Sequence, residues 1–321
     1  MQEAVPEANK PISLSQEVYI ARPRWVMTLK TLVSNRSAML GLFIIFFLLM
    51  VALFADFIAP YPYDKSMRDT PGYVASGGRL PERPPCIHAL GCEDISEHYM
   101  GLDRNSRDQF SRIVYGTRIS LTVGLVSVSI AILFGTLIGL FSGYAGGWFD
   151  DITMRFMDVL LAFPSLLLAI AIVTLREGAN LENAMLAIGI VSVPVYARLV
   201  RSSVLSLKEL EYVTAERALG AGHLRIVFWH ILPNALTPLI VQGTLGIGTA
   251  VIETAGLSFL GVGASEPIPE WGKMLSDARD LFQNAPHLVL FPGIAITITV
   301  LGFNLLGDGL RDVFDPRLRG K

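Results

Sequence analysis

The segment EYVTAERALGAGHLRIVFWHILPN, residues 211–234, lies between two long apolar runs. Its charged side chains, its central Gly-Ala-Gly and its closing Leu-Pro pair do not suit the interior of a membrane span. Together with the residues before it, the segment predicts a helix–turn–helix. The first helix starts at Ser202, glycines end it, and Pro233 falls in the first turn of the next span. A hairpin lying on the membrane surface is the simplest interpretation of this pattern.

The composition around this segment is that of a membrane protein. Hydrophobic residues make up 52% of the chain and charged residues 17%, with a mean hydropathy of +0.50, which exceeds the range of ordinary soluble domains. About six apolar stretches approach the roughly 20 residues that a helix needs to cross a bilayer. We expect an all-α membrane protein with six transmembrane helices, the third and fourth kinked at Pro164 and Pro194. The spans are residues 38–57, 120–141, 159–175, 183–200, 232–252 and 288–306.

The basic residues set the expected orientation, because cytoplasmic segments of membrane proteins are rich in Lys and Arg. The amino-terminal arm, the segment between the fourth and fifth spans and the carboxyl-terminal tail each carry several of them. Both termini are therefore expected in the cytoplasm. Four arginines of the first outer loop favour the opposite orientation, but the charge rule weakens in a loop of this length. They are Arg104, Arg107, Arg112 and Arg118.

These patterns divide the chain into five parts. They are a cytoplasmic arm (1–37), a first transmembrane helix (38–58), an outer loop (59–118), a core (119–307) that carries the cytoplasmic hairpin at about 203–230, and a cytoplasmic tail (308–321). The outer loop ends in an amphipathic stretch, residues 110–119, which predicts a helix along the outer membrane surface. In the later outer loop, Trp271 is expected to anchor at the membrane interface.

The chain's two cysteines, Cys86 and Cys92, both lie in the first outer loop. Exported loops are in an oxidising compartment, so a local disulfide is the favoured interpretation. The alternative is a metal site that also uses His88 and His98. Its spacing matches no standard zinc pattern.

Two features lie within the spans. Gly135, Gly139, Gly143 and Gly147 recur at every fourth position, which predicts close contact with a neighbouring helix. Glu253 is an ionisable group in the fifth span and so a candidate outer gate or substrate contact. A helix starting at Pro233 rises about 1.5 Å per residue, which puts Glu253 about 30 Å along, near the outer interface. An interfacial carboxylate is the simpler alternative.

Signatures of catalysis are absent from the sequence. It contains no phosphate-binding loop, zinc-protease motif or nucleophile elbow, and no basic run interleaved with aromatic residues that would indicate nucleic acid. We predict no catalytic, cofactor-binding or metal-binding residue on this chain, and no nucleic-acid partner. The competing hypothesis is a self-sufficient, ion-gradient-driven carrier, which should show inverted repeats or polar broken spans. Neither is clear in the sequence.

The segment at residues 211–234 resembles the signature of permease subunits of bacterial ATP-binding-cassette importers. That signature reads E-A-A, three residues, G, nine residues, then I-x-L-P. Thr214, Ala215 and Glu216 occupy the E-A-A positions, Gly220 the glycine, and Leu232 with Pro233 the final pair. The chain departs from the signature at Thr214, Glu216 and His230, where the pattern has Glu, Ala and Ile. Other stretches resemble the C-type permeases of dipeptide, oligopeptide and nickel importers, including GYAGGWFDDITMRFMDVLLAFPSLLLAI (143–170), ETAGLSFLGVG (253–263) and NLLGDGLRDVFDPRLRG (304–320).

This resemblance implies an importer subunit in the bacterial inner membrane, for peptides or alternatively for nickel or another small solute. Its implied partners are a homologous B-type permease, two ATPase subunits that bind ATP and Mg, an external solute-binding protein and the lipid bilayer. The hairpin would then contain a coupling helix that docks on an ATPase subunit. The implied docking residues are Glu211, Tyr212, Thr214, Ala215, Glu216, Arg217, Gly220, Ala221, Gly222 and Pro233.

Overall fold

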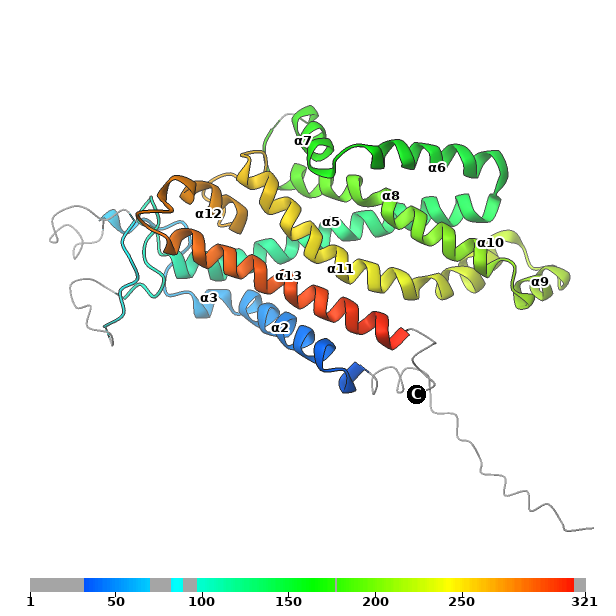
Figure 1. The fold of residues 1–321 in the computed structure, drawn as a ribbon, viewed down its shortest axis with the longest axis horizontal. Helices are drawn as coiled ribbons and strands as arrows, with labels where there is room; N and C mark the ends of the chain where they lie inside the picture. The colour runs from blue at the N-terminus through cyan, green and yellow to red at the C-terminus, as the bar shows by residue number, and fades with distance from the viewer. Residues whose placement is uncertain (1–31, 70–81, 89–96, 177, 315–321) are drawn as a thin grey trace, which may run out of the picture.

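The computed structural model describes residues 32–69, 82–88, 97–176 and 178–314, and in these ranges the regular elements are helices, with three isolated β-bridges. Five long helices run along the length of the molecule (Figure 1). Helix α5 packs against α8, and α2 packs against α13. Helix α11 contacts both α5 and α13. The five helices are α2 (Arg36–Leu53), α5 (Gln109–Ala145), α8 (Leu181–Leu207), α11 (Leu232–Phe259) and α13 (His287–Phe314).

The third predicted span is broken in the structure. Residues 159–162 are the last turn of α6 (Gly147–Ala162), and residues 165–175 form α7 (Ser165–Leu175). The axes of the two helices bend by 97° at Phe163 and Pro164. Phe163 is extended, as residues before proline usually are, and Pro164 has no N–H with which to continue the helix. Pro194 lies inside an unbroken α8. The described residues thus hold five helices long and apolar enough to cross a membrane, or six if the bent pair is one span.

Several predicted boundaries differ from those observed. The first span ends at Leu53, and a short α3 (Ala55–Ile58) follows it. The helix predicted along the membrane surface at 110–119 is the N-terminal part of α5, which runs unbroken from Gln109. The last helix, α13, extends to Phe314, beyond the predicted limit of the core at residue 307.

The N-terminal part of α5 continues straight because its polar residues are buried against loops. Asp108 caps the helix, its carboxylate accepting from the Ser111 backbone N–H at 2.7 Å. Arg112 is buried, and its guanidinium donates to the backbone carbonyls of Tyr63 and Pro267 at 3.1 and 3.3 Å. A side chain with these partners has no reason to face lipid headgroups, which explains why the surface-helix prediction is wrong.

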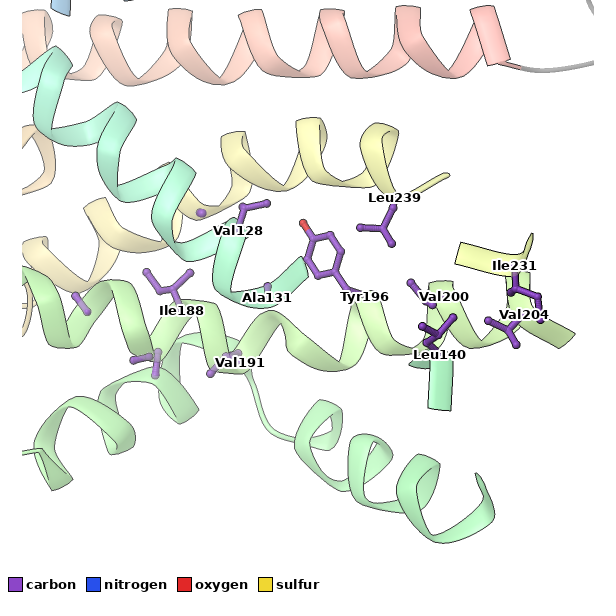
Figure 2. Packing of buried hydrophobic residues seen from close by; sticks show 14 of the residues in the cluster. Val128, Ala131, Leu140, Ile188, Val191, Tyr196, Val200, Val204, Ile231 and Leu239 are labelled. Carbon is purple, nitrogen blue, oxygen red and sulfur yellow. The ribbon is translucent and has the colours of Figure 1, made fainter. Parts of the chain in front are cut away.

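Small residues allow α5 and α8 to pack closely. A Cβ atom at Gly135 would lie 2.6 Å from the Tyr196 Cβ, and one at Gly139 would lie 2.3 Å from the Ala197 carbonyl oxygen. Figure 2 shows apolar side chains of α8 packing in this core, with the Tyr196 ring reaching from α8 towards α11. The predicted glycine contact is confirmed for these positions. Gly147 differs, since no atom lies within 4 Å of its added Cβ and its φ of +60° makes it a turn residue.

At the end of the bundle where α5 begins, the short helix α12 (Trp271–Ala278) packs against α11 and α13. Trp271 is fully buried, and its indole N–H donates to the Ile113 carbonyl of α5 at 3.2 Å. The prediction of a membrane-interface anchor is therefore wrong, because the indole fills the space left by Gly116, where a Cβ would meet it at 2.6 Å. Two 3-10 turns, η1 (Met67–Asp69) and η4 (Arg279–Leu281), complete this end.

The cysteine loop is described only in part. Cys86 is disulfide-bonded, and its backbone pairs with that of His98. Cys92, the other cysteine of the chain, lies outside the described residues, so its pairing stays a prediction. Within the described ranges no group of three or more His, Cys, Asp or Glu side chains could hold a metal ion.

The start of α2 and the end of α13 lie towards the same end of the molecule as the segment between α8 and α11 (Figure 1). The Asn35 side-chain amide, which caps α2, donates to Asp312 in the last turn of α13 at 3.1 Å. At the opposite end lie α3, α12 and the start of α5. The molecule therefore has one end with the polar elbow and an opposite end with the loops around α3 and α12.

Candidate functional site

The polar segment between the fourth and fifth predicted spans forms an elbow between α8 and α11. The elbow is defined as residues 208–231. It consists of α9 (Glu211–Ala218), α10 (His223–Arg225) and a π-helical turn, η3 (Ile226–Ile231), that leads into α11. Residues 203–207, which the sequence placed in the hairpin, belong to α8. Ser202 does not cap a helix, because its hydroxyl donates to the Leu199 carbonyl inside α8 at 2.8 Å.

Helix α9 ends in a left-handed glycine. Gly220 has a φ of +82°, its N–H donates to the Arg217 carbonyl at 3.0 Å, and the Ala221 N–H donates to the Glu216 carbonyl at 3.0 Å. These two bonds form the Schellman motif, which satisfies carbonyls left free at a helix end. No atom lies within 4 Å of a Cβ built on Gly220. The position requires glycine for its backbone conformation and not for space.

One side chain holds α9 against the bundle. Val213 is fully buried and belongs to the main apolar core, together with Val204 of α8 and Ile226 and Ile231 of η3. The remaining face of α9 is exposed along its length. The exposed predicted docking residues of the helix are Glu211, Tyr212, Thr214, Ala215 and Arg217.

Hydrogen bonds link α9 to the turn that leads into α11. The His230 carbonyl oxygen accepts from the Tyr212 hydroxyl at 3.3 Å and from the Asn234 side-chain amide at 2.7 Å. Glu216 Oε2 lies 3.7 Å from His230 Nε2. Thus Glu216 and His230, two of the three departures from the family signature, face each other across the elbow. This pairing could not be seen in the sequence, where 13 positions separate them.

A second set of contacts joins the elbow to the end of α5. The Arg217 guanidinium carbon lies 5.9 Å from the centre of the Tyr144 ring, and the Tyr144 hydroxyl hydrogen-bonds with His223 Nδ1 at 2.8 Å. The Lys208 ammonium donates to the Gly143 carbonyl at 3.1 Å. Sequence reasoning missed Tyr144, because nothing in its neighbourhood marks it as a partner of a helix so much later in the chain.

An ion pair fixes the neighbouring turn between α5 and α6. The Arg201 guanidinium binds both carboxylate oxygens of Asp150 at 2.6 Å, and the Ser142 hydroxyl donates to the same carboxylate. Bidentate pairs of this kind restrain two elements in direction as well as distance. The ends of α5, α6 and α8 are thereby held together beside the elbow.

The elbow also exposes large apolar side chains. Leu219 is 82% exposed, Leu224 66% and Trp229 78%. Leu224 and Trp229 line a shallow depression with Arg225 and Phe228. Exposed apolar side chains beside a charged helix face are typical of surfaces that contact other proteins. None of these three residues was among the predicted docking residues.

The structure brings most of the predicted docking residues into one region. Ala221 and Gly222 form the turn after α9, and Pro233 is exposed in the first turn of α11. Glu253 is not part of this region. It lies near the other end of α11, half-buried, and lines a cavity together with Ser165 of α7.

Comparison with known proteins adds independent findings. Residues 135–320 match the family described as the inner membrane component of binding-protein-dependent transport systems. Residues 24–77 match the N-terminal transmembrane domain of oligopeptide transport permease C.

Individual proteins are similar over most of the chain. The dipeptide transport system permease protein of Alkalihalophilus pseudofirmus is 48% identical over 314 residues, 98% of this chain and 96% of that protein. A glutathione transport system permease protein of Pectobacterium atrosepticum is 45% identical over 279 residues, covering 87% and 86%.

A solved structure shares the fold. The inward-facing MetNI methionine ABC transporter has a chain that is 20% identical, with a TM-score of 0.51 over 64% of this chain and 98% of that chain. The family match, the sequence identities and the shared fold all point to the same family. The chain belongs to the family of inner membrane components of binding-protein-dependent transport systems.

Proposed function

We propose that this chain forms half of the translocation path for di- or oligopeptides in an ATP-driven importer. The support for peptides is that relatives with 42–48% identity are named as permeases for dipeptides, di- and tripeptides, and glutathione. A nickel or other small-solute importer is the alternative from the sequence, and none of these relatives is named for such a solute. The chain is a transport subunit and not an enzyme.

The elbow is the proposed docking site for an ATPase subunit. The observation that carries this is the exposed face of α9 on a helix whose other side is anchored through Val213. Because Arg217 of α9 lies over the Tyr144 ring of α5, and Tyr212 of α9 donates to His230 just before α11, a push on α9 reaches two spans at once. Such a rigid connection suits a part that transmits movement from a soluble motor to a membrane path.

The remaining partners follow from this assignment. A homologous B-type permease supplies the other half of the path, two ATPase subunits bind ATP and Mg, and an external binding protein delivers the solute. The inner membrane is the proposed location, with both termini in the cytoplasm. Two features support this orientation: the basic residues near the elbow and the position of the described ends of α2 and α13 on the same side.

The docking assignment can be tested by photo-crosslinking in the assembled importer. A benzophenone side chain placed at Ala215, which is exposed on α9, should crosslink to an ATPase subunit. The matched control is the same group at Asp280, exposed at the outer end, which should give no ATPase crosslink. Crosslinking to the ATPase from Asp280 and not from Ala215 would contradict both the docking site and the orientation.

A further inference from the structure

A cavity of about 160 Å³ lies between α7, α8 and α11, within the membrane-spanning part of the chain. One face of α11 contributes Gln242, Gly246, Thr249 and Glu253 to its wall. Their spacings of four, three and four residues place them in one line along the helix. The cavity is therefore bordered by a polar track that ends, towards the outside, at a carboxylate.

The other walls are largely apolar, formed by Leu160 and Leu161 of α6, Phe163, and Val191 and Val195 of α8, and they add a few hydroxyl groups. Ser165, the first residue of α7, lines the cavity just after the break at Phe163 and Pro164. Ser192 and Tyr196 of α8 also line the cavity, and the Tyr196 hydroxyl donates to the Gln242 carbonyl at 3.4 Å. Figure 2 shows the Tyr196 hydroxyl turned towards α11. Gly246 leaves room for it, since a Cβ there would lie 2.1 Å from that oxygen.

The wall carries one kind of charge. Among the described residues that line the cavity, Glu253 is the ionisable carboxylate and no Lys, Arg or His is present. A carboxylate in a membrane span is costly to keep ionised without a positive partner, and such groups usually face a cavity or a transport path. A passing cation would supply that partner. One half-buried carboxylate would hold it weakly, which suits a path that must also release its solute.

We propose that this cavity is a segment of the solute path and that Glu253 receives the α-ammonium group of the peptide. The proposal rests on the proposed peptide function for the identity of the solute. The preference for positive charge, in contrast, is inferred from the geometry of the cavity alone. The two parts can therefore be tested separately.

The first experiment measures the preference for positive charge without any peptide. Thr249 is exposed and one turn from Glu253 on the same face of α11, so a Thr249→Cys variant places a thiol in the track. In the assembled importer, a methanethiosulfonate reagent with a trimethylammonium group should modify this thiol about tenfold faster than the analogous sulfonate, because a carboxylate attracts one and repels the other. The chain without the new cysteine provides the background rate.

The matched variants assign this preference to Glu253. Glu253→Gln in the Thr249→Cys chain should bring the ratio of the two rates close to one, and Glu253→Asp should retain most of it. Asp280→Asn removes a carboxylate at the outer end that does not line the cavity, and should leave the ratio unchanged. Equal rates for the two reagents with Glu253 present, or no reaction with either reagent, would overturn the proposal.

The second experiment addresses the solute. With binding protein at saturation, Glu253→Gln should lower the maximal uptake of dialanine about tenfold, whereas Glu253→Asp should lower it much less. Unchanged uptake in Glu253→Gln would overturn the role in receiving the ammonium group. If the unsubstituted importer takes up no peptide, the proposed peptide function is wrong, and the reagent experiment still decides the preference for positive charge.

Discussion

At the scale of single residues, the elbow depends on Gly220 more than on any charged docking residue. Its φ of +82° and the two hydrogen bonds around it end α9 and turn the chain towards α10. A side chain at a left-handed position costs about 1 kcal/mol, less for Asn, which tolerates this conformation. The cost here would come from the backbone, because the surrounding space is empty.

A graded series of substitutions follows from this geometry. Gly220→Val should lower peptide uptake severalfold while the protein still inserts into the membrane, and Gly220→Asn should retain most of the uptake. Gly293→Ala is the control, because Gly293 is equally open but lies inside α13, where alanine adopts the backbone conformation without strain. Uptake and membrane content of each variant are the measurements. Equal uptake in the Val and Asn variants would contradict the conformational explanation.

At the scale of elements, the contact between α5 and α8 forms the centre of the bundle. At Gly139 the Ala197 carbonyl oxygen lies 2.3 Å from a built Cβ, so any side chain must push the two helices apart. Overpacking of this kind usually costs about 1–3 kcal/mol. The contact is also close to the Asp150–Arg201 ion pair, so its loss would loosen the support of the elbow.

The stability of the purified protein should report this contact. Gly139→Val should lower the midpoint of thermal unfolding in detergent by several degrees. Gly293→Ala in α13, where no atom lies within 4 Å of the added Cβ, should leave the midpoint unchanged or raise it slightly. A Gly139→Val protein as stable as the parent would show that α5 and α8 do not pack as described.

The long helices could be predicted from the sequence because their signal is local: about 20 apolar residues in a row identify a span wherever it packs. The sequence could not show that the helix breaks at Pro164 but continues through Pro194, since both positions carry proline. Tertiary packing decides whether a proline breaks a helix. The surface helix at 110–119 was wrong for a related reason. Its polar face is buried by Tyr63 and Pro267, which are distant in sequence.

The candidate site also divides into features that a local sequence pattern predicts and contacts that depend on the fold. Gly220 and the residues of α9 could be found from the signature, because the motif is contiguous. The contacts of α9 with Tyr144 and His230 depend on which helices are neighbours. Exposed Leu219 and Trp229 could not be told from lipid-facing residues by composition, since both kinds are apolar.

At the scale of the whole molecule, α11 joins the elbow to the cavity. The elbow at its start is the proposed contact with the ATPase, and Glu253 near its end borders the cavity. The described ends of α2 and α13 lie on the side of the elbow, and the outer loops lie on the other (Figure 1). A movement of α9 would therefore be carried along α11 to the cavity wall.

The central claim is that this chain transports only as part of an ATP-driven assembly. The most direct test is peptide uptake in proteoliposomes containing this chain, its partner permease, the two ATPase subunits and the binding protein. The account predicts uptake that requires ATP hydrolysis and that stops when the ATPase subunits are left out. Peptide uptake by this chain alone, driven by an ion gradient and indifferent to ATP, would contradict it.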